Sequence, residues 1–202
     1  MTKLADTGTS SKLVGATEIP LISIRPRTTY RGQTNRTLHV PRGYNFYGDN
    51  PVRVRVLYKP TLTGAVWIPC GNPVTAGSFD VGEWYVIVSV GTTDFTLIGA
   101  ASNTIGVSFK AIGTGTGTGT AVDEHSSMEY DISATVVSGG SLIESNPFAT
   151  SKNNPNTANG ILGKSILTLS RTGTSDILTI TGVRLGAASS NSYASITWKE
   201  IR

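Results

Sequence analysis

A two-residue alternation of apolar and polar side chains recurs along this chain and limits the folds open to it. In PVRVRVLYKP, Val52, Val54 and Val56 alternate with Arg53 and Arg55. Successive side chains of an extended strand point to opposite faces, so this pattern predicts strands with one buried face. The same spacing recurs at 194–199 and at 128–132, where Glu129 and Asp131 fall on the polar face, and further strands are expected at 18–24, 36–40, 166–170 and 177–183. We therefore predict an all-β fold, an antiparallel β-sandwich of jelly-roll-like type.

The composition agrees with a sandwich of short strands and turns. Of 202 residues, only 38% are hydrophobic and 15% charged, while 23 are Gly. Gly and Thr are weak helix formers. Apolar runs fall short of the roughly 18 residues of a membrane helix, and the polar start MTKLADTGTSS lacks a signal peptide's apolar stretch, so we expect no membrane insertion. The single cysteine, Cys70, excludes an internal disulfide and is predicted to be buried and inert.

Charge divides the chain into parts. The first 60 residues hold ten basic and three acidic residues, whereas residues 61–126 hold one base, Lys110, and five acids. Within the acidic part, short strands are expected at 82–90, 94–100 and 105–112 between turn-rich ends. If 69–121 is removed, the remaining sequence still reads as strand, turn, strand. We predict a host sandwich from residues 1–68 and 122–202 and a small inserted β module at 69–121, its ends side by side.

The module ends in a Gly-Thr repeat, KAIGTGTGTGTAV, at residues 110–122. A phosphate-binding loop would be followed by a helix, and here a polar DEHSS follows instead. A flexible linker remains an alternative. A strict alternation places every Thr on one side of an extended chain and every Gly on the other, where another backbone can approach closely. We favour an extended segment that returns the module to its host.

Few residues suggest chemistry. Asp123, Glu124, His125 and Ser126 supply the types of an acid–base–nucleophile set, but they are consecutive and are expected to diverge in a solvated turn. The stretch ANGILGKS at 158–165 formally matches a loose nucleotide-binding loop, but a polar loop precedes it and a strand follows, the reverse of what that motif requires. With two histidines in the chain, metal ligands are scarce. We predict no catalytic, cofactor-binding or metal-binding residues.

A charged face is the remaining candidate for binding. Arginines can bind phosphate backbones or anionic glycans. Pairing of these arginines with acids on other strands, within or between subunits, is the favoured interpretation, and nucleic acid is not the expected partner. The candidate interface or anionic-ligand face comprises Arg25, Arg27, Arg53, Arg55, Glu129 and Asp131.

Five segments outside the middle part carry a resemblance: TNRTLHVPRG, YKPTLTGAVW, SSMEYDISATVVSGGSLIES, GKSILTLSRTGTSDILTITG and SYASITWKEIR. In this order they resemble a β-sandwich module of structural proteins from tailed bacteriophages, and the module as a whole covers about three quarters of the chain. The middle, YVIVSVGTTDFTLIGAASNTIGVSFKAIGTGTGTGTA, resembles a second small β element that recurs in phage virion proteins.

The resemblance implies a non-enzymatic virion protein, assembled in the host cytoplasm and displayed as a fibre, appendage or capsid-decoration subunit. Its partners would be other virion proteins and itself, with a homotrimer favoured. The alternative is a receptor-binding module of a phage tail that recognises host-surface glycans. A third class, a glycan depolymerase, would need paired carboxylates in a groove, and the dense acids are Asp123, Glu124, Glu129 and Asp131.

Overall fold

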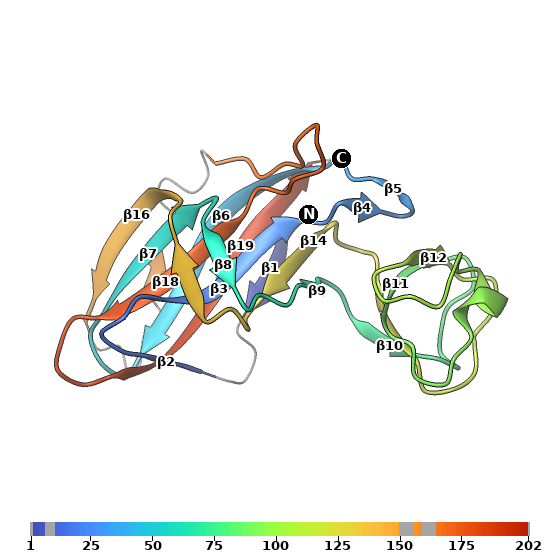
Figure 1. Ribbon diagram of the computed structural model, residues 1–202, viewed down its shortest axis with the longest axis horizontal. Helices are drawn as coiled ribbons and strands as arrows, with labels where there is room; N and C mark the ends of the chain where they lie inside the picture. Colours follow the sequence, from blue (N-terminus) through green and yellow to red (C-terminus); the bar gives the residue numbers. More distant parts are fainter. Residues whose placement is uncertain (1, 7–10, 150–155, 159–164, 202) are drawn as a thin grey trace. The chain divides into compact units, whose positions relative to one another are not determined.

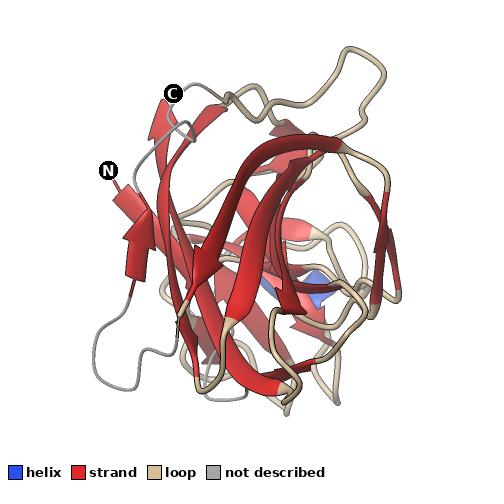
Figure 2. Ribbon diagram, turned by 90° about the vertical axis from the view of Figure 1, so that its left-hand side faces the viewer, coloured by secondary structure: helices blue, strands red, loops and turns tan. Residues whose placement is uncertain are grey.

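The computed structural model describes residues 2–6, 11–149, 156–158 and 165–201. These residues form antiparallel sheets with one short 3-10 helix, so the predicted all-β sandwich is confirmed (Figures 1 and 2). The chain divides into two compact units. The larger contains Met1–Pro26, Arg36–Trp67 and Tyr130–Arg202, and the smaller contains Arg27–Asn35 and Ile68–Glu129.

Two sheets build the larger unit. The first has the order β1-β19-β6-β17, and β2 also pairs with β19. Its strands are β1 (Thr2–Asp6), β2 (Lys12–Val14), β6 (Leu38–Gly48), β17 (Asn156–Ala158) and β19 (Ser190–Ile201). The second has the order β16-β7-β18-β3, followed by β14, the strand in which the chain returns to the larger unit. Its strands are β3 (Ile19–Pro26), β7 (Val52–Tyr58), β14 (Met128–Asp131), β16 (Ser141–Phe148) and β18 (Leu178–Arg184). A separate ladder pairs β8 (Thr61–Thr63) with β15 (Val136–Ser138).

The core of the larger unit follows the alternation in the sequence. Val52, Val54 and Val56 of β7 are fully buried, and so are Ile196 and Trp198 of β19. Both strands were predicted with these faces inward. Two buried hydroxyl groups of this unit, those of Ser23 and Thr179, bond to each other at 2.9 Å. Such pairing removes most of the cost of burying a hydroxyl group.

The smaller unit is built on a four-stranded sheet of order β10-β13-β11-β12. Its strands are β10 (Pro73–Thr75), β11 (Trp84–Ser89), β12 (Ser108–Lys110) and β13 (Thr120–Asp123); β9 (Ile68–Pro69) and the hairpin β4 (Thr29–Tyr30) and β5 (Gln33–Thr34) complete the unit. In the antiparallel register of β10 and β13, Val74 lies opposite Ala121. The register places β10, near the start of the stretch expected to be inserted, beside the residues at its end. The unit differs from the expected 69–121 because it also includes Arg27–Asn35 and extends to Glu129.

Four aromatic rings form the centre of the smaller unit. Phe79, Tyr85, Phe95 and Phe109 are buried, and their ring centroids lie between 4.9 and 6.0 Å apart. The pairs are tilted or edge-on, the arrangement that the charge distribution of aromatic rings favours. The rings therefore give this small unit a hydrophobic core of its own.

The strand predicted at 94–100 is wrong, because part of this segment is the 3-10 helix η1 (Phe95–Ile98). The Asp94 carboxylate accepts the backbone N–H of Thr96 at 3.0 Å and so caps the helix. Gly99 ends it with φ of 109°, which a residue with a side chain rarely adopts. These two capping residues outweigh the β-propensity of the FTLI segment between them.

The Gly-Thr tract is also less regular than predicted. Of the four Gly-Thr pairs at 113–120, only Thr120 belongs to a strand, and Gly115 and Gly117 have φ values of 75° and 102°. The predicted close approach on the glycine side is nevertheless present. A Cβ built on Gly119 would lie 2.5 Å from the carbonyl oxygen of Val90 and 2.7 Å from the Phe95 ring. The tract therefore closes over the core of the smaller unit.

This packing predicts that Gly119→Ala destabilises the smaller unit by about 1–3 kcal/mol, because overpacked sites force their neighbours to move. Gly113→Ala is the matched control within the same tract, since its added Cβ would lie 3.4 Å from the nearest atom, a methyl carbon of Ile98. Amide hydrogen exchange of β11 and β12 measures the difference. Equal protection in the two variants would contradict the close-packing interpretation.

Candidate functional site

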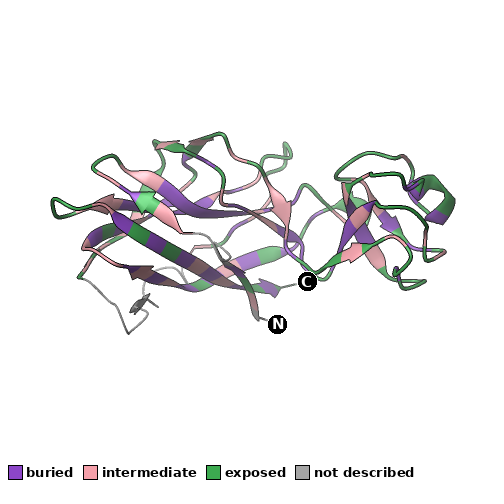
Figure 3. Cartoon of the chain, turned by 90° about the horizontal axis from the view of Figure 1, so that it is seen from below, coloured by how far each residue is buried: buried purple, intermediate pink, exposed green. Residues whose placement is uncertain are grey.

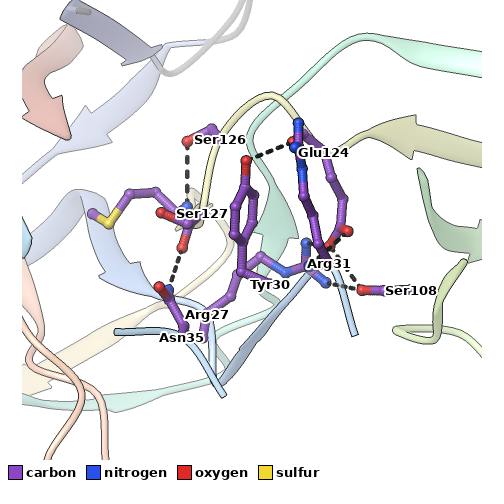
Figure 4. Close-up of polar contacts among 9 residues, drawn as sticks. Arg27, Tyr30, Arg31, Asn35, Ser108, Glu124, Ser126 and Ser127 are labelled. Atoms are coloured by element: carbon purple, nitrogen blue, oxygen red, sulfur yellow. Dashed lines mark hydrogen bonds and ion pairs between the residues drawn. The ribbon is translucent and has the colours of Figure 1, made fainter. Parts of the chain in front are cut away.

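The densest polar cluster of the smaller unit surrounds the buried carboxylate of Glu124 (Figure 4). One carboxylate oxygen accepts hydrogen bonds from the Arg27 guanidinium and from the Ser108 hydroxyl, the latter at 2.7 Å. The other oxygen accepts the backbone N–H of Arg31 at 2.9 Å. The Tyr30 hydroxyl donates to the backbone carbonyl of Glu124 at 3.1 Å. Donors from two distant parts of the sequence therefore converge on one residue.

A tight hairpin brings the donors of 27–35 to Glu124. Between β4 and β5, Arg31 and Gly32 have φ values of 51° and 73°, the positive pair required by a type I′ hairpin turn. The side-chain amide of Asn35 donates to the carbonyls of Arg27 and Ser127 at 2.9 and 3.0 Å, which ties both ends of the hairpin segment together. The YRGQ sequence at this turn is a hairpin signal that sequence reasoning missed.

The prediction of a solvated turn at 123–126 is wrong, because most of these residues are buried. The Glu124 side chain is fully buried, and Asp123 and Ser126 are buried as well, so only His125 is exposed. The Asp123 carboxylate accepts the backbone N–H and side-chain amide of Asn72, each at 3.0 Å, and lies 3.0 Å from Nδ1 of His125. Both carboxylates hold neighbouring segments together, because their oxygens already accept hydrogen bonds from them. Their environment suits a structural role better than proton transfer.

The six residues of the predicted charged face have separate environments. Arg27 is buried against Glu124, and the Arg25 guanidinium lies 4.0 Å from the centre of the Trp67 ring. Arg53 is exposed on β7, and Glu129 is half-buried.

The remaining two members also have partners in the larger unit, and the Arg55 pair is of the kind expected for these arginines. Arg55 is paired with Glu18 at 2.7 Å, and Asp131, which was expected on the exposed face of its strand, is buried. The Asp131 carboxylate accepts the backbone N–H groups of Val66 and Ser133 at 2.8 and 3.0 Å, and these bonds explain its burial.

The ion pair of Arg55 and Glu18 lines a pocket of about 220 Å³ in the larger unit. The rest of its wall includes Leu57, Leu142 and the turn residues Gly139 and Gly140. Glu18 also accepts a hydrogen bond from the hydroxyl of Thr181. A ligand in this pocket would have to replace partners that both charged groups already have, so the pocket is a weak candidate for a binding site.

The first sheet of the larger unit exposes a broad apolar surface. Along β19 buried and outward residues alternate strictly, and such alternation is visible along the strands in Figure 3. Five outward apolar side chains on this sheet have exposed fractions between 37 and 64%. We call this surface the outer sheet face. It comprises these five apolar side chains and the two charged side chains that are exposed among those the structure describes on this sheet. The seven residues are Leu4, Leu13, Leu38, Tyr193, Ile201, Arg42 and Lys199.

Two further sequence predictions can be compared with the described residues. Cys70, the single cysteine, is buried, as predicted. The nucleotide-loop match at 158–165 lies largely outside the described residues. In the described parts of the chain, no group of three or more His, Cys, Asp or Glu side chains is arranged to hold a metal ion. No helix there has the length and apolar character that crossing a membrane would require.

Comparison of the chain with protein-family models, with curated proteins and with solved structures finds no match.

The Glu124 cluster predicts a large effect of truncating one partner. Glu124→Ala leaves the buried Arg27 guanidinium without a counter-charge and should cost about 3–5 kcal/mol in the free energy of unfolding of the smaller unit. Glu83→Ala, an exposed carboxylate of the same unit, should change it by no more than about 0.5 kcal/mol. Urea unfolding followed by hydrogen exchange separates the two results. The double variant R27M/E124L should recover most of the loss, and equal losses in all three variants would contradict the argument.

A second ion pair predicts how stability responds to acid. Burial alone would raise the pKa of Asp176, but Lys59 at 2.8 Å and the backbone and hydroxyl donors of Thr168 lower it overall. The folded pKa is thus below the unfolded value of about 3.9. The Asp176 contribution is therefore present above pH 4 and is lost as the pH falls through the folded pKa. Asp176→Asn should flatten the acid limb of a plot of unfolding free energy against pH. An unchanged acid limb would show that the carboxylate is not coupled to folding.

Proposed function

We propose that this chain is a non-enzymatic structural subunit of a tailed-bacteriophage particle, displayed as a fibre, appendage or decoration protein. The observation that carries the proposal is the outer sheet face, where five apolar side chains, up to 64% exposed, point outward from one sheet. Several exposed apolar side chains on one face suit protein–protein contact. The resemblance of the sequence to phage modules suggests that the assembly is a phage particle.

The acidic residues support the same interpretation. A glycan depolymerase requires two carboxylates that face each other across a groove and remain free to exchange protons. In the smaller unit, the oxygens of Asp123 and Glu124 are occupied by backbone and side-chain donors. In the larger unit, Asp131 is occupied in the same way. These carboxylates stabilise loops, which suits a rigid displayed subunit.

Particle analysis tests the proposal. Virions of the phage that encodes the chain would be purified on a density gradient, and their proteins quantified by mass spectrometry alongside immunogold labelling with an antibody to the chain. We expect the chain in a fixed ratio to the capsid protein and labelling at one site on the particle. Recovery of the chain only in the soluble part of the lysate would overturn the proposal. A glycan array read in parallel tests the receptor-binding alternative, which saturable binding to one glycan would support.

A further inference from the structure

A second exposed apolar surface lies on the loops of the smaller unit. Val81, Leu97 and Ile112 have exposed fractions of 67, 76 and 69%. Backbone hydrogen bonds bring their segments together, because Gly82, next to Val81, donates to the carbonyl of Ala111 at 2.8 Å. Ile112 in turn donates to the carbonyl of Ile98 at 3.1 Å. We call these three side chains, which come from the turn before β11, from η1 and from the loop after β12, the apolar loop cluster.

The two apolar surfaces belong to units of opposite charge. The smaller unit has six acidic residues against three bases, whereas the larger has seven acidic residues against 14 bases. The segments of the apolar loop cluster also carry Asp80, Glu83 and Asp94, all exposed, together with one exposed base, Lys110. On the outer sheet face, by contrast, the exposed charged side chains that the structure describes are Arg42 and Lys199.

We propose that the apolar loop cluster of one copy binds the outer sheet face of a second copy of this chain. The inference rests on the proposed structural role, because a displayed subunit must contact its neighbours. The charges favour this pairing of unlike surfaces over the pairing of two like surfaces. Two outer sheet faces would bring Arg42 and Lys199 against themselves, and two loop clusters would bring their carboxylates together, and each like-charge contact opposes association. Pairing unlike surfaces buries both sets of apolar side chains and places acids beside bases.

Contacts between unlike surfaces have a specific consequence for assembly. Each copy uses one surface as donor and the other as acceptor, so a reciprocal two-fold dimer, a closed ring and an open chain all satisfy the pairing. Both surfaces carry solvent-exposed charges, so salt should weaken the association. The expected trimer is one ring that this geometry permits.

Charge reversal on each surface tests the proposal with the purified full chain. R42E/K199E makes the outer sheet face acidic, and D80K/E83K makes the margin of the loop cluster basic. Light scattering after size exclusion should give the wild type a mass above the 21.2 kDa of one chain. Either variant alone should associate at least about tenfold more weakly. An equimolar mixture should recover association, because each variant then offers the surface that complements the other.

A matched control distinguishes the effect of charges on the outer sheet face from the effect of the net charge of the unit. R53E/R171E changes the charge of the larger unit as much as R42E/K199E but lies outside the outer sheet face, and it should associate like the wild type. Circular dichroism melting confirms that all variants are folded.

Three results would overturn the inference: a monomeric wild type, full association of D80K/E83K alone, or a mixture no more associated than its components. None of them bears on whether the chain is found in virions, which particle analysis decides separately.

Discussion

The buried carboxylate of Glu124 is the constraint on which the organisation of the smaller unit depends. Removing an ionised carboxylate from water costs several kcal/mol unless charged and hydrogen-bonding partners replace the water. Here the replacements come from Ser108 in β12 and from Arg27 and Arg31, which precede Glu124 by more than 90 residues. The hairpin segment therefore belongs to the smaller unit, although in sequence it falls between two segments of the larger one.

The regular parts of the fold could be predicted because they follow from local sequence. Alternation in β7 and β19 predicts which residues are buried, since side chains of a strand must point alternately to its two faces. The exceptions occur where a polar group has a strong local partner. Asp131 was assigned to the exposed face of its strand, but three backbone N–H groups within its reach make burial favourable. Likewise, Asp94 caps the 3-10 helix η1 in a segment where the sequence pattern predicted a strand.

The Glu124 cluster could not be predicted, because its members are distant in sequence and their meeting depends on tertiary structure. The signals that point to it are weak. An Arg-Gly pair in YRGQ occupies the hairpin turn where Asn-Gly is the more familiar combination. The acids of AVDE directly follow a buried strand, and their position suggests a surface turn unless the donors are known. Sequence reasoning identified Arg27 as a candidate for ligand binding, whereas the structure uses it to neutralise an internal acid.

In the larger unit too, carboxylates accept hydrogen bonds from nearby groups of the same unit. Six of its seven acidic residues, all those whose side chains are described, accept hydrogen bonds from groups within the unit. Two of these acids, Glu18 and Asp176, pair with Arg55 and Lys59, and the other four accept hydrogen bonds from neutral donors. Arg42, Arg53 and Lys199 remain exposed, while Asp80 and Glu83 are exposed on the smaller unit. The charge difference between the units is thus present at their surfaces, where it can orient one copy against the next.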